Sequence, residues 1–288
     1  MALASLTRAR YRKERPTTEL VCELGFRPLA QPLVAVLLPL RVHPVAVVLA
    51  NFAAGIAGAV LLAEGRLWQA ALLVQLKTLL DNADGQLARA SGKVSALGRY
   101  LDTESDFLVN AALLAAIAVH GGGAAGWVLC GVALLLLTFV LSADFNLERL
   151  WRREHGEAVG PAGARERGLT RVLACLYDRT LGVQDRFVER FAEARIASIA
   201  GPAADARAAA AVRRAYHDRA TLVVLVNFGL STQLAVLGAC LVAGVPWLWP
   251  LLVVGCFAAT LLVLARREVL GVRALRASLA AAGARAAA

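Results

Sequence analysis

Long apolar runs separated by short polar turns dominate the chain. Six runs approach the roughly 20 residues that a helix needs to cross a bilayer. They lie at Val45–Ala63, Trp68–Ala90, Gly98–His120, Ala124–Leu141, Leu222–Val242 and Leu248–Leu264. Residues 28–42 are also apolar, but three prolines interrupt them, which favours a helix lying at the membrane surface. The pattern predicts an all-α integral membrane protein with six transmembrane helices and an N-terminal interfacial amphipathic helix.

The remaining segments are polar and mostly basic. We divide the chain into a cytosolic N-terminal and juxtamembrane segment (1–44), a transmembrane domain (45–266) and a basic, Ala-rich tail (267–288) that we expect to be frayed. Residues 143–219 form a cytosolic insertion between the fourth and fifth spans. Near the N-terminus, Thr17 or Thr18 could cap a short helix over Glu19–Leu24.

Two amphipathic helices are predicted within the 143–219 insertion. In the first, four apolar residues follow helical spacing: Leu169, Val172, Leu173 and Leu176. The second would carry Val183, Phe187 and Phe191, and Gly160-Pro161 and Gly201-Pro202 are predicted breaks. Packing on the cytosolic face of the membrane is the simpler role for these helices, and binding a separate partner is the alternative.

Composition and charge narrow the class of protein to which the chain can belong. The chain is 59% hydrophobic with a net charge of +10, and the positive residues flank apolar runs, which favours a membrane protein over a nucleic-acid binder. Five scattered cysteines form no CxxC pair, so neither a zinc site nor a disulfide framework is expected. No signal peptide is visible in the basic N-terminal dozen residues. Because Lys and Arg concentrate on one side of six spans, we expect that side to be cytoplasmic, in a bacterial inner membrane.

Four aspartates interrupt the second and third apolar runs. Asp81 and Asp84 are three residues apart, and Asp102 and Asp106 are four apart, so each pair projects from one face of its helix. Carboxylates that converge between two membrane helices repel one another unless a cation lies among them. Mg²⁺ and Mn²⁺ prefer oxygen ligands and are the natural candidates. Ionisable residues at membrane depth are functional by default.

These aspartates belong to a longer pattern, D-x2-D-G-x2-A-R-x8-G-x3-D-x3-D, which resembles the signature of the CDP-alcohol phosphotransferases. All eight fixed positions are present without a gap: Asp81, Asp84, Gly85, Ala88, Arg89, Gly98, Asp102 and Asp106. The resemblance covers few residues directly, but the hydropathy around them is also similar to that family. In our orientation the signature lies at the cytoplasmic ends of the second and third spans.

The resemblance implies a chemistry and a set of roles. Family members transfer a substituted phosphate from a CDP-linked donor to an alcohol and release CMP. Two Mg²⁺ or Mn²⁺ ions would be held by Asp81, Asp84, Asp102 and Asp106, and Asp106 would also be the general base for the acceptor hydroxyl. The CDP donor would be bound by Asp84, Gly85, Ala88, Arg89 and Gly98. Gly98 would also let the second and third spans pack closely, and the protein would be a homodimer.

Other polar residues are weaker candidates. Lys77 could pair with Asp81 or bind a phosphate of the acceptor, and Asn110 could orient Asp106, so both are tentative acceptor-site residues. Asn51 and Asn227 could form hydrogen bonds between spans. Two basic groups flank the insertion and could either bind a phosphorylated acceptor or anchor the helices: Arg149, Arg152 and Arg153, and Arg213, Arg214, His217 and Arg219.

Three functions follow from this reading. The first is a metal-dependent membrane transferase that moves a phosphatidyl group from CDP-diacylglycerol to a small alcohol, in glycerophospholipid biosynthesis. The second joins a soluble CDP-alcohol, such as CDP-choline or CDP-ethanolamine, to diacylglycerol. The third, from another class, is a cation-binding transport or scaffold protein. The signature does not identify the acceptor.

Overall fold

The computed structural model describes residues 16–156, 168–201 and 206–286, with side chains up to residue 281. Helices joined by turns and short connections make up these residues, which confirms the all-α prediction. Their bounds are η1 (Cys22–Phe26), α2 (Arg27–Leu37), α3 (Pro44–Ala63), α4 (Leu67–Ala90), α5 (Ala96–Val119), α6 (Gly123–Glu154), α7 (Leu169–Arg179), α8 (Leu181–Ala200), α9 (Ala206–Tyr216), α10 (Arg219–Val226), α11 (Leu230–Val242) and α12 (Leu248–Ala286). The predicted break at Gly160-Pro161 lies outside the described residues, as does the N-terminal arm up to residue 15.

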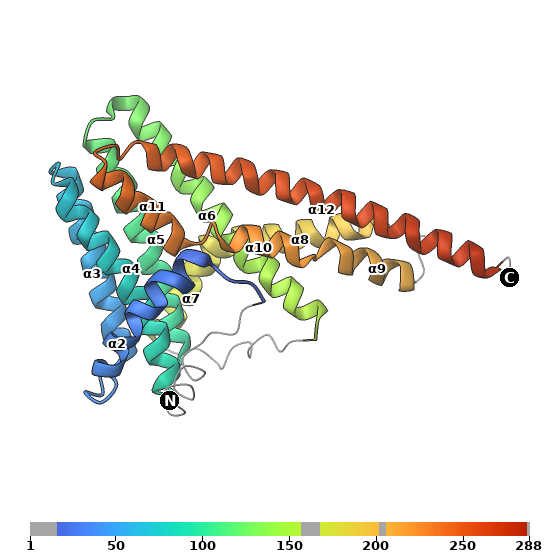
Figure 1. Cartoon of the computed structure of the whole chain (residues 1–288), viewed down its shortest axis with the longest axis horizontal. Coiled ribbons are helices and arrows are strands. Elements are labelled where there is room, and N and C mark those ends of the chain that lie inside the picture. The colour runs from blue at the N-terminus through green and yellow to red at the C-terminus, as the bar shows by residue number, and fades with distance from the viewer. Residues whose placement is uncertain (1–15, 157–167, 202–205, 287–288) are drawn as a thin grey trace.

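Helices α3, α4 and α5 form an up-and-down bundle (Figure 1). The helix α3 begins with Pro44 in its first turn, and the His43 ring nitrogen Nδ1 accepts a hydrogen bond from the Val45 N–H. After α4, Gly92 adopts a φ of 68°, and Ser95 caps α5 by accepting from the Gly98 N–H at 3.1 Å. This tight connection puts the last turns of α4 beside the first turns of α5.

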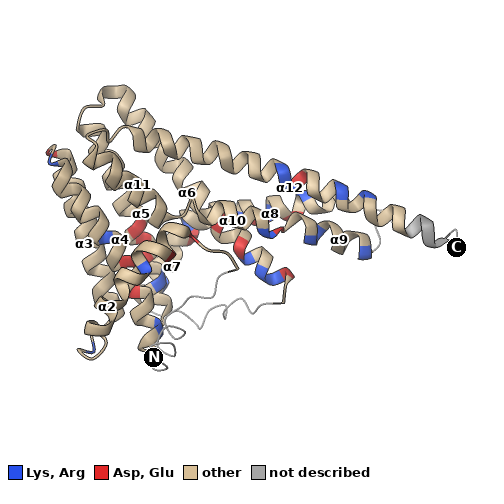
Figure 2. Cartoon of the chain, viewed as in Figure 1, with Lys and Arg blue, Asp and Glu red and all other residues tan. Residues whose placement is uncertain are grey.

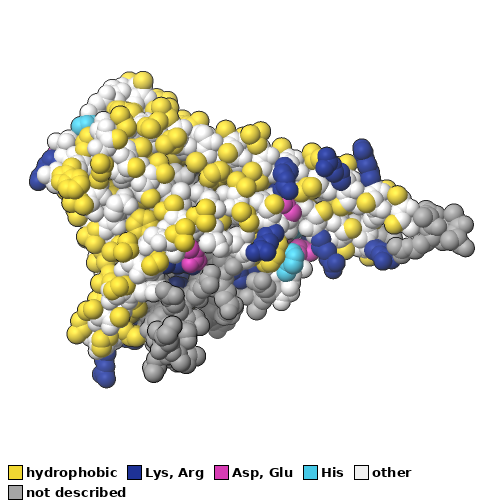
Figure 3. Space-filling view, in the orientation of Figure 1, with side chains coloured by type: hydrophobic (Ala, Val, Ile, Leu, Met, Phe, Trp, Pro, Cys, Tyr) yellow, Lys and Arg dark blue, Asp and Glu magenta, His cyan; other side chains and the backbone are white. Residues whose placement is uncertain are grey.

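Four parts of the described chain are long and apolar enough to cross a membrane: Pro44–Ala63, Gly123–Glu154, Ala206–Val242 and Leu248–Ala281. The helices α4 and α5 have 24 residues each, long enough for a span, but they carry the charged residues of the signature. They remain predicted spans, as does the total of six. Hydrophobic side chains cover the face over α3 and the first half of α12, and Lys and Arg gather toward the C-terminal end (Figure 3).

The fourth predicted span is longer than expected. We predicted an end at Leu141, whereas α6 continues to Glu154. The added turns are polar, and ion pairs satisfy their charges: Arg152 pairs with Glu148 one turn before it, and Arg149 pairs with Glu189 of α8 at 2.7 Å. Because these charges find partners, the helix does not end where the apolar run ends.

The fifth predicted span, Leu222–Val242, is not one helix. It is divided into α10 and α11 by a turn at residues 227–229. The Asn227 side chain accepts a hydrogen bond from the Leu20 N–H at 2.9 Å and donates to the Thr18 carbonyl. Asn227 therefore ties the turn to the N-terminal segment instead of joining two spans, and such side-chain bonds to the backbone compete with helix formation.

The last predicted span and the tail form a single helix. The helix α12 continues through residue 267 to Ala286, so the expectation of a frayed tail is wrong for these residues. Contacts with residues 206–218 stabilise α12 beyond the end of its apolar run. Arg267 is buried, donates to the Tyr216 carbonyl at 2.6 Å and stacks over the Tyr216 ring. Arg266 pairs with Asp218 at 2.8 Å.

The N-terminal segment is also more continuous than predicted. Helical structure starts at Leu20, passes through the π-helical turn η1 and continues into α2, with Pro32 inside the helix. The predicted end at Leu24 is therefore wrong, and Pro28 and Pro32 lie within the continuous helix. Ala30 and Val34 of α2 pack against Ala83 and Leu87 of α4, which holds this segment against the signature helix. Its place at a membrane surface remains a prediction.

Both predicted helices of the insertion are present as α7 and α8, and Gly201 ends α8 with a φ of 74°. Their apolar faces are not buried within the chain. Leu169, Val172 and Leu176 are exposed on α7, and so are Phe187 and Phe191 on α8. The opposite face of α8 packs on α6, with Val188, Ala192 and Ile196 buried. The insertion is thus docked on the helical bundle.

Candidate active site

The signature aspartates come from two neighbouring helices. Asp81 and Asp84 lie on the last turns of α4, and Asp102 and Asp106 on the first turns of α5, which the Gly92 turn brings alongside. Acidic positions colour the ribbon in the region of α4 and α5 (Figure 2).

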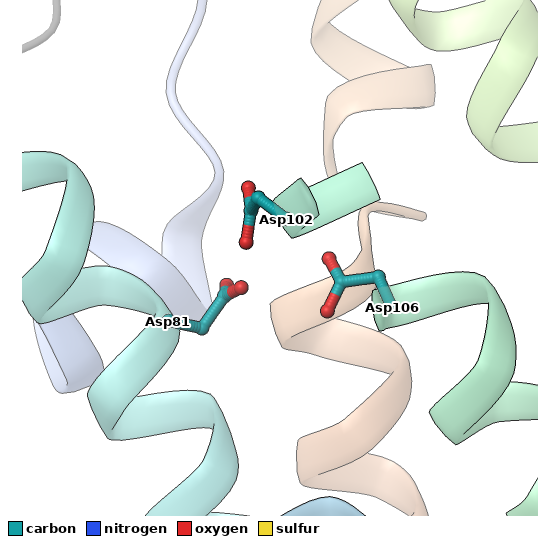
Figure 4. A group of neighbouring side chains, drawn as sticks. All are labelled: Asp81, Asp102 and Asp106. Carbon is teal, nitrogen blue, oxygen red and sulfur yellow. The ribbon is translucent and has the colours of Figure 1, made fainter. Parts of the chain in front are cut away.

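Three of the four carboxylates converge. Asp81, Asp102 and Asp106 each offer an oxygen, and these oxygens lie within 4.8 Å of one another. Figure 4 shows the three side chains pointing toward one space, Asp81 from one side and Asp102 and Asp106 from the other. Asp84 is outside this trio but lines the same cavity. One oxygen each of Asp84 and Asp102 is buried without a hydrogen-bond partner among the described residues, so this oxygen-rich set fits a hard divalent cation.

One buried lysine neutralises part of this cluster. Lys77 is 1% exposed, and its ammonium forms an ion pair with Asp106 and lies 3.6 Å from an Asp81 oxygen. The predicted pairing with Asp81 is thus present, and the contact with Asp106 was not anticipated. Asn51 of α3 donates to Asp81 at 3.3 Å, which confirms the predicted hydrogen bond between helices. Lys77 therefore holds Asp81 and Asp106 in place, and Asn51 holds Asp81.

A cavity of about 450 Å³ lies beside the aspartates. Of the residues predicted to bind the donor, Asp84, Gly85 and Arg89 line this cavity, whereas Ala88 and Gly98 do not. A methyl group built on Gly85 would lie 3.3 Å from the Arg89 guanidinium, so the glycine leaves room for that side chain.

The predicted packing role of Gly98 is wrong. Among the described residues, a methyl group there would meet only the Ser95 hydroxyl of its own turn within 4 Å, and no atom of α4. Gly98 instead belongs to the capped first turn of α5, where its N–H donates to the Ser95 hydroxyl.

Asn110 also faces the cavity, one turn beyond Asp106. Its side chain is 4% exposed, and its amide oxygen has no hydrogen-bond partner among the described residues. We predicted that Asn110 orients Asp106. No hydrogen bond joins the two side chains, and the partner of Asp106 is Lys77 instead.

The rest of the cavity lining comes from residues that we did not predict. They belong to the N-terminal segment, to α6 to α8 and to the start of α11: Glu19, Cys22, Arg27, Thr138, Ser142, Asp144, Tyr177, Asp185 and Ser231. The sequence offered one usable signal, because Ser142 and Asn146 place polar side chains one turn apart where the fourth apolar run ends. Nothing local to residues 177–185 marks them as part of a site.

Asp185 organises the part of the lining that α6, α7 and α8 form. Its Oδ1 accepts from the Ser142 hydroxyl at 2.5 Å and from the Asn146 amide at 2.6 Å, and its Oδ2 accepts from the Tyr177 hydroxyl. Burial, together with this hydrogen bond to Asp185, raises the pKa of Tyr177 above its usual range. Tyr177 therefore keeps its proton throughout the physiological pH range and acts as a donor.

The basic groups that flank the insertion do not line the cavity. Arg149 and Arg153 both pair with Glu189, and Arg152 pairs with Glu148. In the second group, Arg213 lies 3.6 Å from Glu154, and Arg219 donates to the Pro16 carbonyl. These contacts favour the anchoring role over the binding of a phosphorylated acceptor.

Comparison with known proteins agrees with this geometry. Residues 41–176 match the model of the CDP-alcohol phosphatidyltransferase family. This range contains α3 to α6, both pairs of aspartates and Arg89. Residues 41–176 are therefore similar to the CDP-alcohol phosphatidyltransferase family.

Several curated proteins are similar over part of their length. The chain is 34% identical over 99 residues to archaetidylinositol phosphate synthase of Pyrococcus horikoshii, covering 34% of this chain and 49% of that protein. It is 34% identical over 97 residues to phosphatidylinositol phosphate synthase of Cutibacterium acnes, covering 32% and 47%. A bifunctional IPC transferase and DIPP synthase of Rubrobacter xylanophilus is 38% identical over 104 residues, covering 35% and 24%.

The chain thus spans about a quarter to a half of the length of these relatives. No solved structure matches it.

Proposed function

We propose that the protein is an integral membrane transferase that moves a phosphatidyl group from CDP-diacylglycerol to a small alcohol and releases CMP. The observation that carries this proposal is the convergence of Asp81, Asp102 and Asp106 beside a cavity that Asp84 and Arg89 also line. The family match and relatives named as synthases of inositol phosphate lipids support the same chemistry.

The carboxylate oxygens fit Mg²⁺ or Mn²⁺, held by Asp81, Asp102 and Asp106, with Asp84 as a further ligand from the same cavity. Bound divalent ions would neutralise the diphosphate oxygens and stabilise the departing CMP. Phosphoryl transfer needs such alignment and charge neutralisation more than covalent help from the protein.

The remaining roles in the reaction belong to Arg89, Asp106 and Lys77. Arg89, with its planar array of donors, would bind phosphate oxygens of the donor. The acceptor hydroxyl oxygen attacks phosphorus and its proton passes to the Asp106 carboxylate. The bond from phosphorus to the CMP oxygen breaks, and CMP leaves with the electron pair. Lys77 keeps Asp106 in position through their ion pair.

For the membrane, we propose that α3 to α6, the α10–α11 pair and the first half of α12 make the six spans. The hydrophobic surface over α3 and α12 supports this placement (Figure 3). The cavity would open on the cytoplasmic side, where a nucleotide-linked donor is available. A homodimer remains part of the proposal, by resemblance to the family.

The test is CMP release by the purified full chain in lipid nanodiscs, supplied with CDP-diacylglycerol, Mg²⁺ or Mn²⁺ and a panel of alcohols. Release that requires an acceptor supports the proposal. Release only from CDP-choline or CDP-ethanolamine with diacylglycerol would favour the soluble-donor alternative. The absence of release from every donor, with Mn²⁺ flux into liposomes, would favour transport.

A further inference from the structure

The cavity beside the aspartates has two chemically different sides. One side is formed by α4 and the N-terminal segment and carries two arginines, Arg89 and Arg27. The other side is formed by α6, α7 and α8, where the described lining residues include no lysine or arginine. The α5 residues Asp106 and Asn110 also line the cavity, and α5 packs on both α6 and α7. Among the described lining residues, a phosphate group would meet cations on the first side only.

The second side is formed by polar side chains that hydrogen bonds join to Asp185, and we call it the Asp185 wall. Asp185 of α8 is 9% exposed and accepts hydrogen bonds from Ser142 and Asn146 of α6 and from Tyr177 of α7. This single carboxylate therefore joins three helices. Its three hydrogen-bond partners are all neutral, and no described lysine or arginine lines this side, so it suits hydroxyl donors better than a phosphate group.

The Asp185 wall also contacts α5, the helix that carries Asp102 and Asp106, through a pair of aromatic rings. The Tyr177 ring packs edge to face on Tyr100, with the centroids 5.8 Å apart, and Tyr100 lies two residues before Asp102 on α5. Tyr177 and Asp185 also lie beyond residue 176, where the family match ends. The chain's own α7–α8 segment thus completes a cavity whose other half is the family signature.

An unsatisfied group faces the same space. Asn110 lines the cavity and is only 4% exposed. Its amide oxygen has no hydrogen-bond partner among the described residues. A buried amide oxygen without a partner is costly, and a ligand hydroxyl would satisfy it. Because Asn110 is one turn from Asp106, a hydroxyl bound there belongs to a molecule that also reaches the proposed base.

We propose that the acceptor binds between Asn110 and the Asp185 wall, and that it is a neutral polyol and not a phosphorylated one. This inference rests on the proposed transferase function and adds the acceptor class. Asn110 would accept a hydrogen bond from one acceptor hydroxyl, and Asp185 would act as a positioning residue that fixes the Ser142 and Tyr177 side chains.

The first test separates acceptor binding from donor binding. With the full chain in nanodiscs, CDP-diacylglycerol and Mn²⁺, Asn110→Ala should raise KM for a neutral polyol about tenfold, as expected for one lost hydrogen bond, and leave KM for the donor within about twofold. Asn110→Ser, which keeps a polar atom, should recover part of the loss. Leu108→Ala, an exposed position on the same helix, is the matched control. Equal changes in both KM values, or no change, would overturn the assignment.

The second test addresses the wall. Asp185→Asn keeps the side-chain size but removes the charge, so it should raise KM for the neutral polyol and reduce the discrimination against its phosphate ester. Glu193→Gln, on the exposed side of α8, should change neither value. A thermal unfolding scan of each variant identifies any loss of folding. Unchanged discrimination in folded Asp185→Asn would contradict the role of the wall.

The third test compares acceptors directly, using glycerol and myo-inositol against sn-glycerol 3-phosphate and myo-inositol 1-phosphate. CMP release with a neutral polyol and little with its phosphate ester supports the inference. Release only with the phosphate esters would overturn the acceptor class and leave the transferase function intact. If no CMP is released with any of these four acceptors or with any other alcohol, the proposed function itself fails, and this inference fails with it.

Discussion

Lys77 provides a sharp test, because its charge is buried among the proposed metal ligands. Its side chain is 1% exposed, pairs with Asp106 and lies 3.6 Å from Asp81. In Lys77→Met the chain keeps an unbranched side chain but loses the charge. Removing one partner of a buried ion pair costs about 3–5 kcal/mol of stability, because the other charge remains buried and uncompensated. The metal-free variant should therefore unfold at a lower temperature than the wild type.

The same change should strengthen metal binding. Two unit charges about 4 Å apart interact by about 4 kcal/mol at an effective dielectric constant of 20, and Lys77 repels any cation among these carboxylates by an energy of that order. Part of this gain is lost to rearrangement of Asp106, so we expect the Mg²⁺ concentration for half-maximal stabilisation to fall at least about tenfold, since 1.4 kcal/mol is a factor of ten. Turnover should fall because Asp106 loses its partner.

The assay is thermal unfolding of the purified protein across a Mg²⁺ titration, together with CMP release. Leu76→Met, at an exposed position next to Lys77, controls for the introduced methionine. Lys77→Arg keeps the charge and provides a folded comparison if Lys77→Met does not fold. An unchanged Mg²⁺ dependence together with wild-type turnover in Lys77→Met would refute this reasoning.

Three further predictions concern single residues. Asp106→Asn should lower the rate of CMP release by about 10²–10⁴, the usual contribution of a general base, whereas Asp178→Asn, on the exposed side of α7, should not. Arg89→Ala should raise KM for CDP-diacylglycerol by about tenfold or more in steady-state kinetics, because it removes charged hydrogen bonds to phosphate; an unchanged donor KM would remove Arg89 from the donor site. Gly55→Ala should lower the free energy of unfolding by about 1–3 kcal/mol in denaturant titrations, because the added methyl group would lie 2.6 Å from a Val109 methyl; unchanged stability would mean that α3 and α5 can separate there.

The helices of the signature region could be predicted from the sequence because local rules determine them. Pro44, the apolar run after it and the capped turn at Ser95 place α3, α4 and α5 within about two residues of the predicted bounds. The i,i+3 and i,i+4 spacing of the aspartates likewise predicted that each pair would share a face. The convergence of the trio follows from the short turn at Gly92.

What could not be predicted depends on contacts between distant residues. The continuation of α6 to Glu154 relies on pairing with α8, and the break at Asn227 relies on the N-terminal segment. The Lys77 ion pair with Asp106 joins residues 29 positions apart. The Asp185 wall depends on how the insertion docks on α6, which apolar periodicity does not report. Gly98 was misread because a glycine in a signature does not reveal what it faces.

The central claim is that the carboxylates of α4 and α5 bind divalent cations that a CDP-linked donor requires. Its most direct test is CMP release from CDP-diacylglycerol and an acceptor alcohol by protein stripped of metal, before and after Mn²⁺ is restored. We predict no release without metal, recovery with Mn²⁺, and no recovery in Asp102→Asn, whose carboxylate belongs to the converging trio. Full rates in excess chelator, or wild-type recovery in that variant, would contradict the claim.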